Sequence, residues 1–133
     1  MNEISKNQYT IALDAMSGDH GPEVVVRAAK KSLDKHKNLS VIFFGKKEMI
    51  GGLCSSIIGD SSRISIVDTK DVIEMSDSPV DSIRNKKDSS MRVAIDYVKS
   101  NQAHAVVSAG NTGALMATAK FVLKMLPGIS RPA

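Results

Sequence analysis

Three segments of the sequence combine residues that can bind an anion or transfer a proton. They are DAMSGDHGP at residues 14–22, EMSDSPVDSIRNKKDSSMR at residues 74–92, and SAGNTGALM at residues 108–116. Their amide, hydroxyl, basic and imidazole groups can donate hydrogen bonds to phosphate oxygens and transfer a proton near neutral pH. The sequence therefore predicts a site for phosphate or for a phosphate-bearing substrate.

The segment at residues 108–116 makes the simplest anion site. A β-branched run leads into Gly110, Asn111, Thr112 and Gly113 and then into a helical pattern. The unpaired N–H groups at the start of such a helix attract anions. The Thr112 hydroxyl and the Asn111 amide can add hydrogen bonds, and Gly113 allows a ligand to approach the backbone. Simple capping of the helix by Asn111 or Thr112 explains this short pattern equally well.

The first segment places an imidazole at a sharp turn. Gly18 and Gly21 flank Asp19 and His20, so the chain can present His20 at the end of the preceding strand, where it can transfer a proton. Asp14 and Asp19 can orient that ring, bind an ammonium-like group or hold a metal ion. The spacing alone favours ordinary turn and capping roles for both carboxylates.

Basic side chains mark the middle segment, at Arg84, Lys86 and Lys87. They precede Asp88, Ser89 and Ser90 at the expected start of a helix, where cations and helix N–H groups can act together on phosphate. Such a short basic cluster is most often a solvated face. All three segments follow predicted strands, and the carboxyl ends of parallel strands share one edge of a sheet. The basic cluster is therefore expected at the same edge as the other two segments, which favours a site.

The elements that must position these segments follow an α/β pattern. Four apolar, β-branched runs at residues 10–16, 39–45, 63–68 and 103–109 alternate with helical patterns, which predicts a doubly wound, mainly parallel sheet. Four helices are expected. The first begins at Pro22 and the second covers residues 49–58. The third begins after Asp88 or Ser89, and the fourth covers residues 112–126. The last helix is apolar nearly all round, which indicates burial against the sheet or a partner. Residues 69–87 are expected to form a long irregular loop.

Length and composition limit the other possibilities. The 133 residues predict a single domain over residues 1–133. A net charge of +4 with few aromatic residues argues against nucleic-acid binding. The single Cys54 indicates a packing role in a reducing compartment, and His36 and His104 are expected to be structural or exposed. No signal peptide or membrane-spanning run is seen, so the sequence predicts a cytosolic location. No cofactor or bound metal is expected.

Long motifs give the chain a resemblance to a known family. ALDAMSGDHGPEVVV, SDSPVDSIRNKKDSSMRVA and AVVSAGNTGALMATAKFVLKMLPGISRPA resemble the bacterial phosphate acyltransferases that make acyl phosphate from acyl-acyl carrier protein and inorganic phosphate for phospholipid synthesis. The resemblance covers residues 9–133. It implies a three-layer Rossmann-like fold, a homodimer, and a cytosolic location that allows contact with the inner membrane face.

The resemblance also implies site residues. Its motifs contain the residues that we expect to form the site. We expect catalytic roles for His20, Lys87 and Asn111. We expect substrate or phosphate binding by Asp14, Gly18, Asp19, Gly21, Lys86, Asp88, Ser89, Ser90, Ser108, Gly110, Thr112 and Gly113. Ser17 replaces a family glycine and would strain the turn if that position needs a positive φ.

Members of the family are more than twice as long as this chain, so it corresponds to their N-terminal part and the sheet is expected to be incomplete. Further site residues are expected in the other part, and whether this part is active by itself stays open. Two other classes also remain open. A nucleotide- or dinucleotide-binding oxidoreductase would share the fold but lacks its GxGxxG fingerprint here. A non-catalytic assembly fragment is the second, with exposed sheet edges that favour association.

Overall fold

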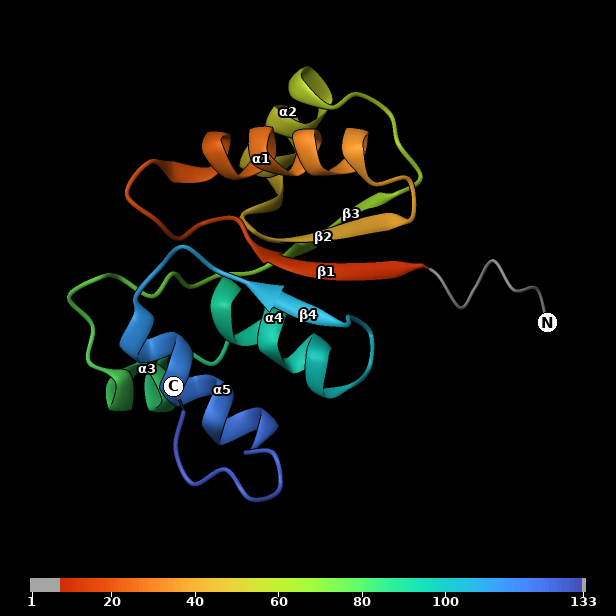
Figure 1. Ribbon diagram of the computed structural model, residues 1–133. Helices are drawn as coiled ribbons and strands as arrows, with labels where there is room; N and C mark the ends of the chain where they lie inside the picture. The colour runs from red at the N-terminus through yellow and green to blue at the C-terminus, as the bar shows by residue number, and fades with distance from the viewer. Residues whose placement is uncertain (1–7, 133) are drawn as a thin grey trace.

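The computed structural model describes residues 8–132, so most of the polar N-terminal stretch and residue 133 lie outside the described residues. The elements are β1 Tyr9–Asp14, α1 Gly21–Lys35, β2 Leu39–Gly45, α2 Lys47–Ile57, β3 Ile64–Asp68, α3 Pro79–Asn85, α4 Ser90–Lys99, β4 Ala105–Val107 and α5 Thr112–Leu123. The four strands of this part of the chain form one parallel sheet in the order β3-β2-β1-β4 (Figure 1). The predicted α/β class and the parallel sheet are confirmed.

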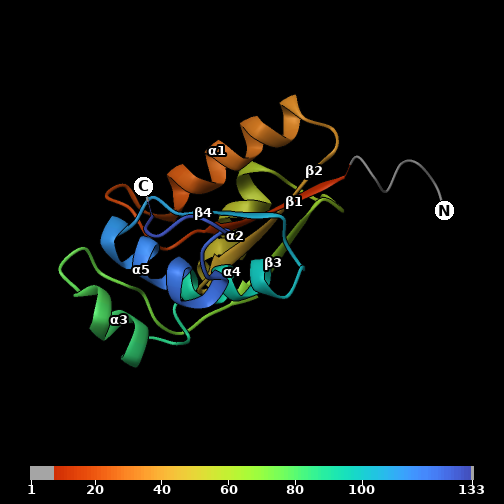
Figure 2. The same ribbon diagram turned by 60° about the horizontal axis from the view of Figure 1, so that its bottom comes forward.

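The helices form a layer on each face of the sheet. α1 and α2 cover one face, and α4 covers the other with α5 and α3 packed beyond it, as Figures 1 and 2 show from two directions. None of the described helices combines the length and the apolar character needed to cross a membrane.

The order of the strands reverses at β1. The chain first builds β1, β2 and β3 outward through α1 and α2, and then returns through α3 and α4 to place β4 on the free side of β1. Because these crossovers are right-handed in nearly all proteins, the helices change face at the reversal. Ligands of open α/β sheets bind beyond the carboxyl ends of the strands at this switch point, which here lies between β1 and β4.

Two neighbouring phenylalanines anchor the two halves of the core. Phe43 and Phe44 in β2 point to opposite faces and are both 0% exposed. Phe43 joins the cluster under α1 and α2, and Phe44 packs with Ala12 of β1 and Ala94 of α4. The Phe44 ring lies edge-on to Tyr97, with 4.9 Å between the ring centroids. Burial of each large side chain stabilises the fold by about 1.5–3 kcal/mol.

The predicted irregular loop at residues 69–87 is wrong in its second half, because α3 forms there. Ser78 caps this helix by accepting a hydrogen bond from the N–H of Asp81 at 3.1 Å. Pro79 occupies its first turn, where the missing N–H costs nothing. A serine followed by proline and then an acidic residue is therefore a helix start here, and the turn interpretation missed it.

Several predicted boundaries also differ from the structure. β1 ends at Asp14 rather than residue 16, β4 has 3 residues instead of the 7 of residues 103–109, and α5 stops at Leu123, three residues short of 126. The expected burial of α5 is only partly correct. It packs on α3 and α4 and buries Ala114 and Thr118, whereas Phe121 is 53% exposed.

Candidate active site

A buried carboxylate joins the two strands at the switch point. Asp14, the last residue of β1, is fully buried and accepts a hydrogen bond from Ser108 Oγ, beyond β4, at 2.8 Å. Its other oxygen accepts the N–H of Met16 at 3.2 Å, and Ser108 Oγ in turn accepts the N–H of Gly110 at 3.2 Å. Buried charges need such partners. Asp14 and Ser108 therefore fix the loops that follow β1 and β4 relative to each other.

The same two loops touch through glycines. A Cβ at Gly110 would lie 2.6 Å from Ser17 Cβ, and a Cβ at Gly18 would lie 3.2 Å from Ala109 Cβ. Gly18 also has a φ of 110°, a conformation that favours glycine. Ser17 is not among the described residues with positive φ, so the condition under which serine would strain this turn is not met. Its buried Oγ has no hydrogen-bond partner among the described residues.

His20 and Asp19 lie on the outer side of this contact. Both are exposed, and together with Gly18, Gly21 and Ala109 they line a hollow of about 60 Å³. His20 occupies the N-cap position of α1, yet its side chain does not cap the helix. Its imidazole is therefore available to a ligand in the crevice, as a proton-transfer role requires.

The start of α5 presents free N–H groups to the crevice. Asn111 Oδ1 accepts the N–H of Ala114 at 3.1 Å and so caps the helix, which confirms the capping interpretation of this residue. Thr112 and Gly113 are exposed, and their N–H groups make no hydrogen bond to the described part of the chain. Two donors at the positive end of the helix dipole can therefore bind an anion.

Asn111 also attaches α5 to the middle segment. Its Nδ2 donates to the carbonyl oxygens of Glu74, Met75 and Asp77 at 3.1, 3.3 and 2.9 Å. Gly113 lies against Pro79, where an added Cβ would be 3.3 Å from Pro79 Cγ. The middle segment thus meets the loop after β4, as its strand-end position predicts, but largely through backbone groups.

The predicted cations of the middle segment have different settings, and Lys86 is held by the segment to which it belongs. Lys86 Nζ donates to the carbonyl oxygen of Val72 at 2.7 Å and pairs with Asp77. The hydrogen bond from Lys86, followed by that from the Glu74 N–H, lowers the pKa of Asp77. Lys86 therefore holds the strap of residues 72–77 beneath Asn111.

The hydroxyl residues that follow shape the start of α4. Ser89 is buried and caps α4 by accepting the N–H of Arg92 at 3.1 Å. Ser90 is buried with its Oγ unpartnered in the described part of the chain. The carbonyl oxygen of Asp88 accepts the N–H groups of Lys70 and Asp71. Ser89 and the backbone of Asp88 therefore have structural contacts in the described part of the chain.

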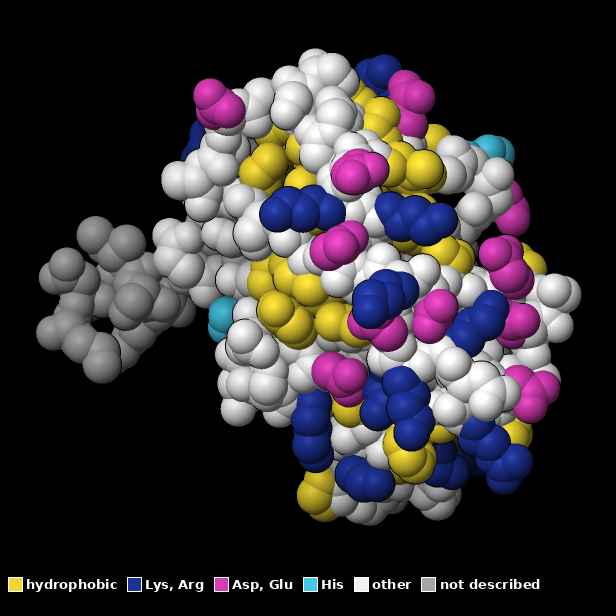
Figure 3. Space-filling view, turned by 180° about the vertical axis from the view of Figure 1, so that it is seen from behind, with side chains coloured by type: hydrophobic (Ala, Val, Ile, Leu, Met, Phe, Trp, Pro, Cys, Tyr) yellow, Lys and Arg dark blue, Asp and Glu magenta, His cyan; other side chains and the backbone are white. Residues whose placement is uncertain are grey.

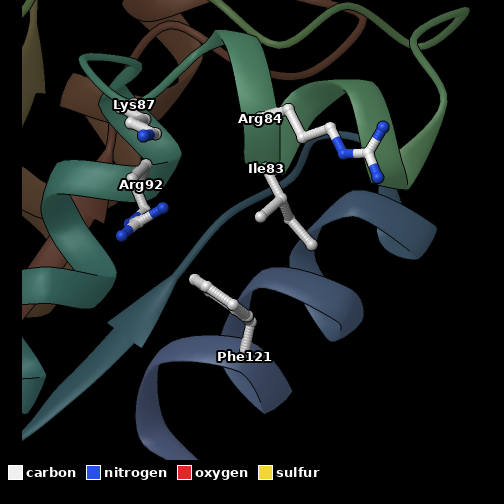
Figure 4. Close-up of a pocket in the computed structure, with 5 residues that line it drawn as sticks. All are labelled: Ile83, Arg84, Lys87, Arg92 and Phe121. Atoms are coloured by element: carbon white, nitrogen blue, oxygen red, sulfur yellow. The ribbon is translucent and has the colours of Figure 1, made fainter.

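Lys87 lines a different cavity of about 460 Å³ between α3, α4 and α5, together with Ile83, Arg84, Arg92 and Phe121 (Figure 4). Arg92 and Phe121 were not among the predicted site residues. Their position depends on how α3, α4 and α5 pack, and the sequence shows only that Arg92 lies one turn beyond the Ser89 cap.

The isolated histidines and the cysteine have structural settings. His104 Nδ1 accepts the N–H of Thr10 at 3.0 Å, and His36 is exposed at the end of α1. Cys54 is buried in the cluster under α1 and α2, and burial raises the pKa of its thiol. These placements confirm the structural interpretation of all three residues.

Comparison with known proteins identifies the family. The sequence profile of the family described as "Fatty acid synthesis protein" matches residues 9–133. A protein of Halorhodospira halophila named phosphate acyltransferase is 52% identical over 128 residues, which are 96% of this chain and 37% of the relative. Proteins of the same name from Nitrosococcus oceani and Methylococcus capsulatus are 54% and 55% identical over 93% of the chain.

The chain spans about 37% of the length of these curated relatives. Its match to the family profile nevertheless includes all three segments that carry the candidate site. On this evidence the chain belongs to the fatty acid synthesis protein family, in the part that contains the switch point between β1 and β4.

Proposed function

We propose that this chain forms the phosphate-binding part of an acyltransferase that serves fatty acid and phospholipid synthesis. The observation that carries the proposal is the pair of free N–H groups at Thr112 and Gly113, placed at the switch point. The relatives named phosphate acyltransferase support it. They also favour acyl transfer over a nucleotide-dependent oxidation, which shares only the fold.

The proposed reaction transfers an acyl group from the thioester of acyl-acyl carrier protein to inorganic phosphate. A phosphate oxygen attacks the thioester carbonyl, the C–S bond breaks, and acyl phosphate and the carrier thiol are formed. The proton of the hydrogen phosphate ends on the leaving sulfur, so the reaction needs no other reactant. The enzyme must supply an anion pocket, a donor for the developing oxyanion and correct placement of both substrates.

The residues divide into two groups in this proposal. Phosphate oxygens accept hydrogen bonds from the N–H groups of Thr112 and Gly113 and from the Thr112 hydroxyl. His20 carries the proton from phosphate to sulfur. The residues that position these groups are Asp14, Gly18, Asp19, Gly21, Ser89, Ser108, Gly110 and Asn111. Lys86, Asp88 and Ser90 support the crevice from behind. The carrier protein, the homodimer, the cytosolic location and contact with the membrane face remain predictions.

Two substitutions at one position test the phosphate site in the full-length enzyme that carries this chain. Thr112→Val removes the hydroxyl and keeps the N–H. Thr112→Pro also removes the N–H, at the helix position that tolerates proline best. Asn111 has a φ of −58° and a ψ of 109°, an extended ψ that suits the residue before proline.

A hydrogen bond to a charged group contributes about 1.5–3 kcal/mol. Thr112→Pro should therefore raise the phosphate KM roughly tenfold to a hundredfold in an assay of acyl phosphate formation, and Thr112→Val should raise it less. Ser65→Ala on exposed β3 is the control. An unchanged phosphate KM in both Thr112 variants would remove this helix start from the site. A second variant, His20→Gln, should lower kcat and flatten its pH dependence, while the phosphate KM changes little.

A further inference from the structure

The strap of residues 72–77 is part of the packing that orients α5. Ile73 is 3% exposed and lies in the same core cluster as Met91 of α4 and Ala114 of α5. Ala114 is in the first turn of α5, directly after the two residues whose N–H groups are free. A shift of the strap would therefore displace the end of the helix that faces the crevice.

The carboxylate of Asp77 closes the strap into a fixed turn. One of its oxygens, Oδ2, accepts the N–H of Glu74 at 2.8 Å and pairs with Lys86 Nζ. Lys86 Nζ also donates to the carbonyl oxygen of Val72 at 2.7 Å. The side chains of Lys86 and Asp77 are only 29% and 26% exposed, so solvent screens this pair less than a fully exposed one. Asp77 thus connects the strap to the residue that follows α3.

The backbone of Asp77 reaches the start of α5 through a single side chain. Its carbonyl oxygen accepts Asn111 Nδ2 at 2.9 Å, the shortest of the three contacts between this amide and the strap. The other end of the same amide accepts the N–H of Ala114 at 3.1 Å. Asn111 directly precedes Thr112 and Gly113, so its orientation sets the direction of their N–H groups.

We propose that Asp77 is a positioning residue for the anion site at the start of α5. Its carboxylate fixes the strap, the strap carbonyl oxygens hold Asn111, and Asn111 directs the N–H groups of Thr112 and Gly113 into the crevice. Direction matters because a hydrogen bond weakens steeply when its angle at the hydrogen falls below about 120°. The proposal rests on the phosphate site of the proposed function and adds to it a residue outside the predicted site.

Charge alone would give Asp77 the opposite effect. Figure 3 shows many Lys and Arg side chains and few carboxylates at the lower end of that face, where Figure 1 places α3 and α5. A carboxylate in these surroundings opposes the attraction of phosphate, so its removal should lower the phosphate KM if only charge mattered. A positioning role predicts a higher phosphate KM. The sign of the change therefore separates the two effects.

The Asp77→Ala variant of the full-length enzyme that carries this chain tests the proposal. In an assay of acyl phosphate formation, its phosphate KM should rise roughly threefold to thirtyfold. The KM for the acyl carrier substrate should stay within about twofold. Asp77→Asn keeps an acceptor for the Glu74 N–H and should raise the phosphate KM less. Asp34→Ala breaks an exposed pair with Lys30 in the last turns of α1 and is the matched control, with both KM values unchanged.

A loss of folded enzyme gives a different result. It reduces the number of active molecules, so kcat falls while the phosphate KM stays the same. That result, or a phosphate KM that is unchanged or lower in Asp77→Ala, would overturn the positioning role.

A double variant tests the route through Asn111. Asn111→Ser keeps a side chain that can cap α5 but removes the amide nitrogen that binds the strap, so it should also raise the phosphate KM. Because both changes break the same connection, Asp77→Ala with Asn111→Ser should raise the KM no further than the larger single effect. An increase equal to the product of the two single effects would contradict this route.

Thr112→Pro distinguishes failure of this proposal from failure of the proposed function. A raised phosphate KM in Thr112→Pro with no rise in Asp77→Ala would leave the phosphate site in place and remove Asp77 from it. An unchanged phosphate KM in Thr112→Pro would remove the site itself, and the role of Asp77 with it.

Discussion

Asn111 uses both ends of its amide to join two parts of the chain. The oxygen caps α5, and the nitrogen donates to carbonyl oxygens of residues 74–77. The sequence indicated a cap at Asn111 or Thr112 as one interpretation, because asparagine and threonine before an apolar helix are common start signals. It could not predict the three carbonyl partners, since these lie more than 30 residues away and depend on the crossover through α3.

Replacement of Asn111 by alanine should destabilise the chain more than loss of a helix cap alone. The cap contributes about 1 kcal/mol, and the carbonyl oxygens left without a donor add roughly 1–3 kcal/mol. We expect Asn111→Ala to lower the free energy of unfolding by about 2–4 kcal/mol in urea titrations. Asn85→Ala, at an exposed asparagine, is the matched control and should change it by less than about 0.5 kcal/mol.

Asp77 makes the strap of residues 72–77 sensitive to acid. The hydrogen bonds from Lys86 and from the Glu74 N–H lower its pKa in the folded chain below the ordinary 3.8. A lowered folded-state pKa means that Asp77 contributes its full stability above pH 3.8, and that this contribution is lost as the pH falls through the folded-state value.

Thermal unfolding of the Asp77→Asn variant between pH 6 and pH 3 checks this prediction. Near neutral pH the variant should be less stable than the unsubstituted chain, and the difference should shrink in acid. Asp34→Asn, at an exposed aspartate of α1, is the control. Its stability should fall with decreasing pH in the same way as that of the unsubstituted chain. A difference that stays constant with pH would contradict the prediction.

At the scale of elements, a tight contact joins the loops after β1 and β4. Because a Cβ at Gly110 would lie 2.6 Å from Ser17 Cβ, Gly110→Ala should overpack this contact and cost about 1–3 kcal/mol. Removing the Ser17 side chain creates the missing space. The double variant Ser17→Gly with Gly110→Ala should recover most of the stability, as measured by urea unfolding of all three variants. Additive losses would show that the two positions are independent.

α2 contains two glycines that the packing does not require. The helix continues through both, and an added Cβ at Gly52 would meet nothing within 4 Å. Because glycine costs about 0.5–1 kcal/mol relative to alanine in a helix, Gly52→Ala should stabilise the chain by about that amount. Its melting temperature should rise. A fall would show that α2 needs a flexible backbone.

The helices were predictable from sequence to different degrees. α1 and α4 have clear start signals and one apolar face, so their position and buried side follow from the pattern. α3 is too short for a periodic pattern, and its Ser78 cap resembles a turn. α5 is apolar on most sides, so its sequence does not distinguish the side that packs on α3 and α4 from the side that carries Phe121.

At the scale of the whole molecule, the parallel sheet and its reversal position the candidate site. Alternating strands and helices predict a shared carboxyl edge, and this brings the loops after β1 and β4 together. The side-chain directions of Lys86 and Lys87 were beyond sequence reasoning. Lys86 pairs with Asp77, whereas its neighbour Lys87 lines the cavity beside Arg92.

β4 has an exposed apolar side chain beside the part of the sheet that α1 covers. Val107 is 52% exposed and, with Ile11, Leu13 and Ala28 of α1, lines an apolar groove of about 270 Å³. Exposed apolar sheet edges promote association. The chain should therefore self-associate with rising concentration in light-scattering measurements, and Val107→Lys should reduce this. Ser65→Lys on the opposite edge strand is the control; equal association of both variants would contradict the role of β4.

The cluster under α1 and α2 uses only side chains between residues 13 and 66. The other two clusters need residues as late as 106 and 123. During synthesis, β1, β2, β3 and their two helices can therefore close one face of the sheet before the rest of the chain leaves the ribosome. The opposite face, with Ala12 and Phe44, stays open until α4 arrives. We expect the nascent chain to fold from its N-terminal side, and its unfinished face to be the surface that chaperones bind.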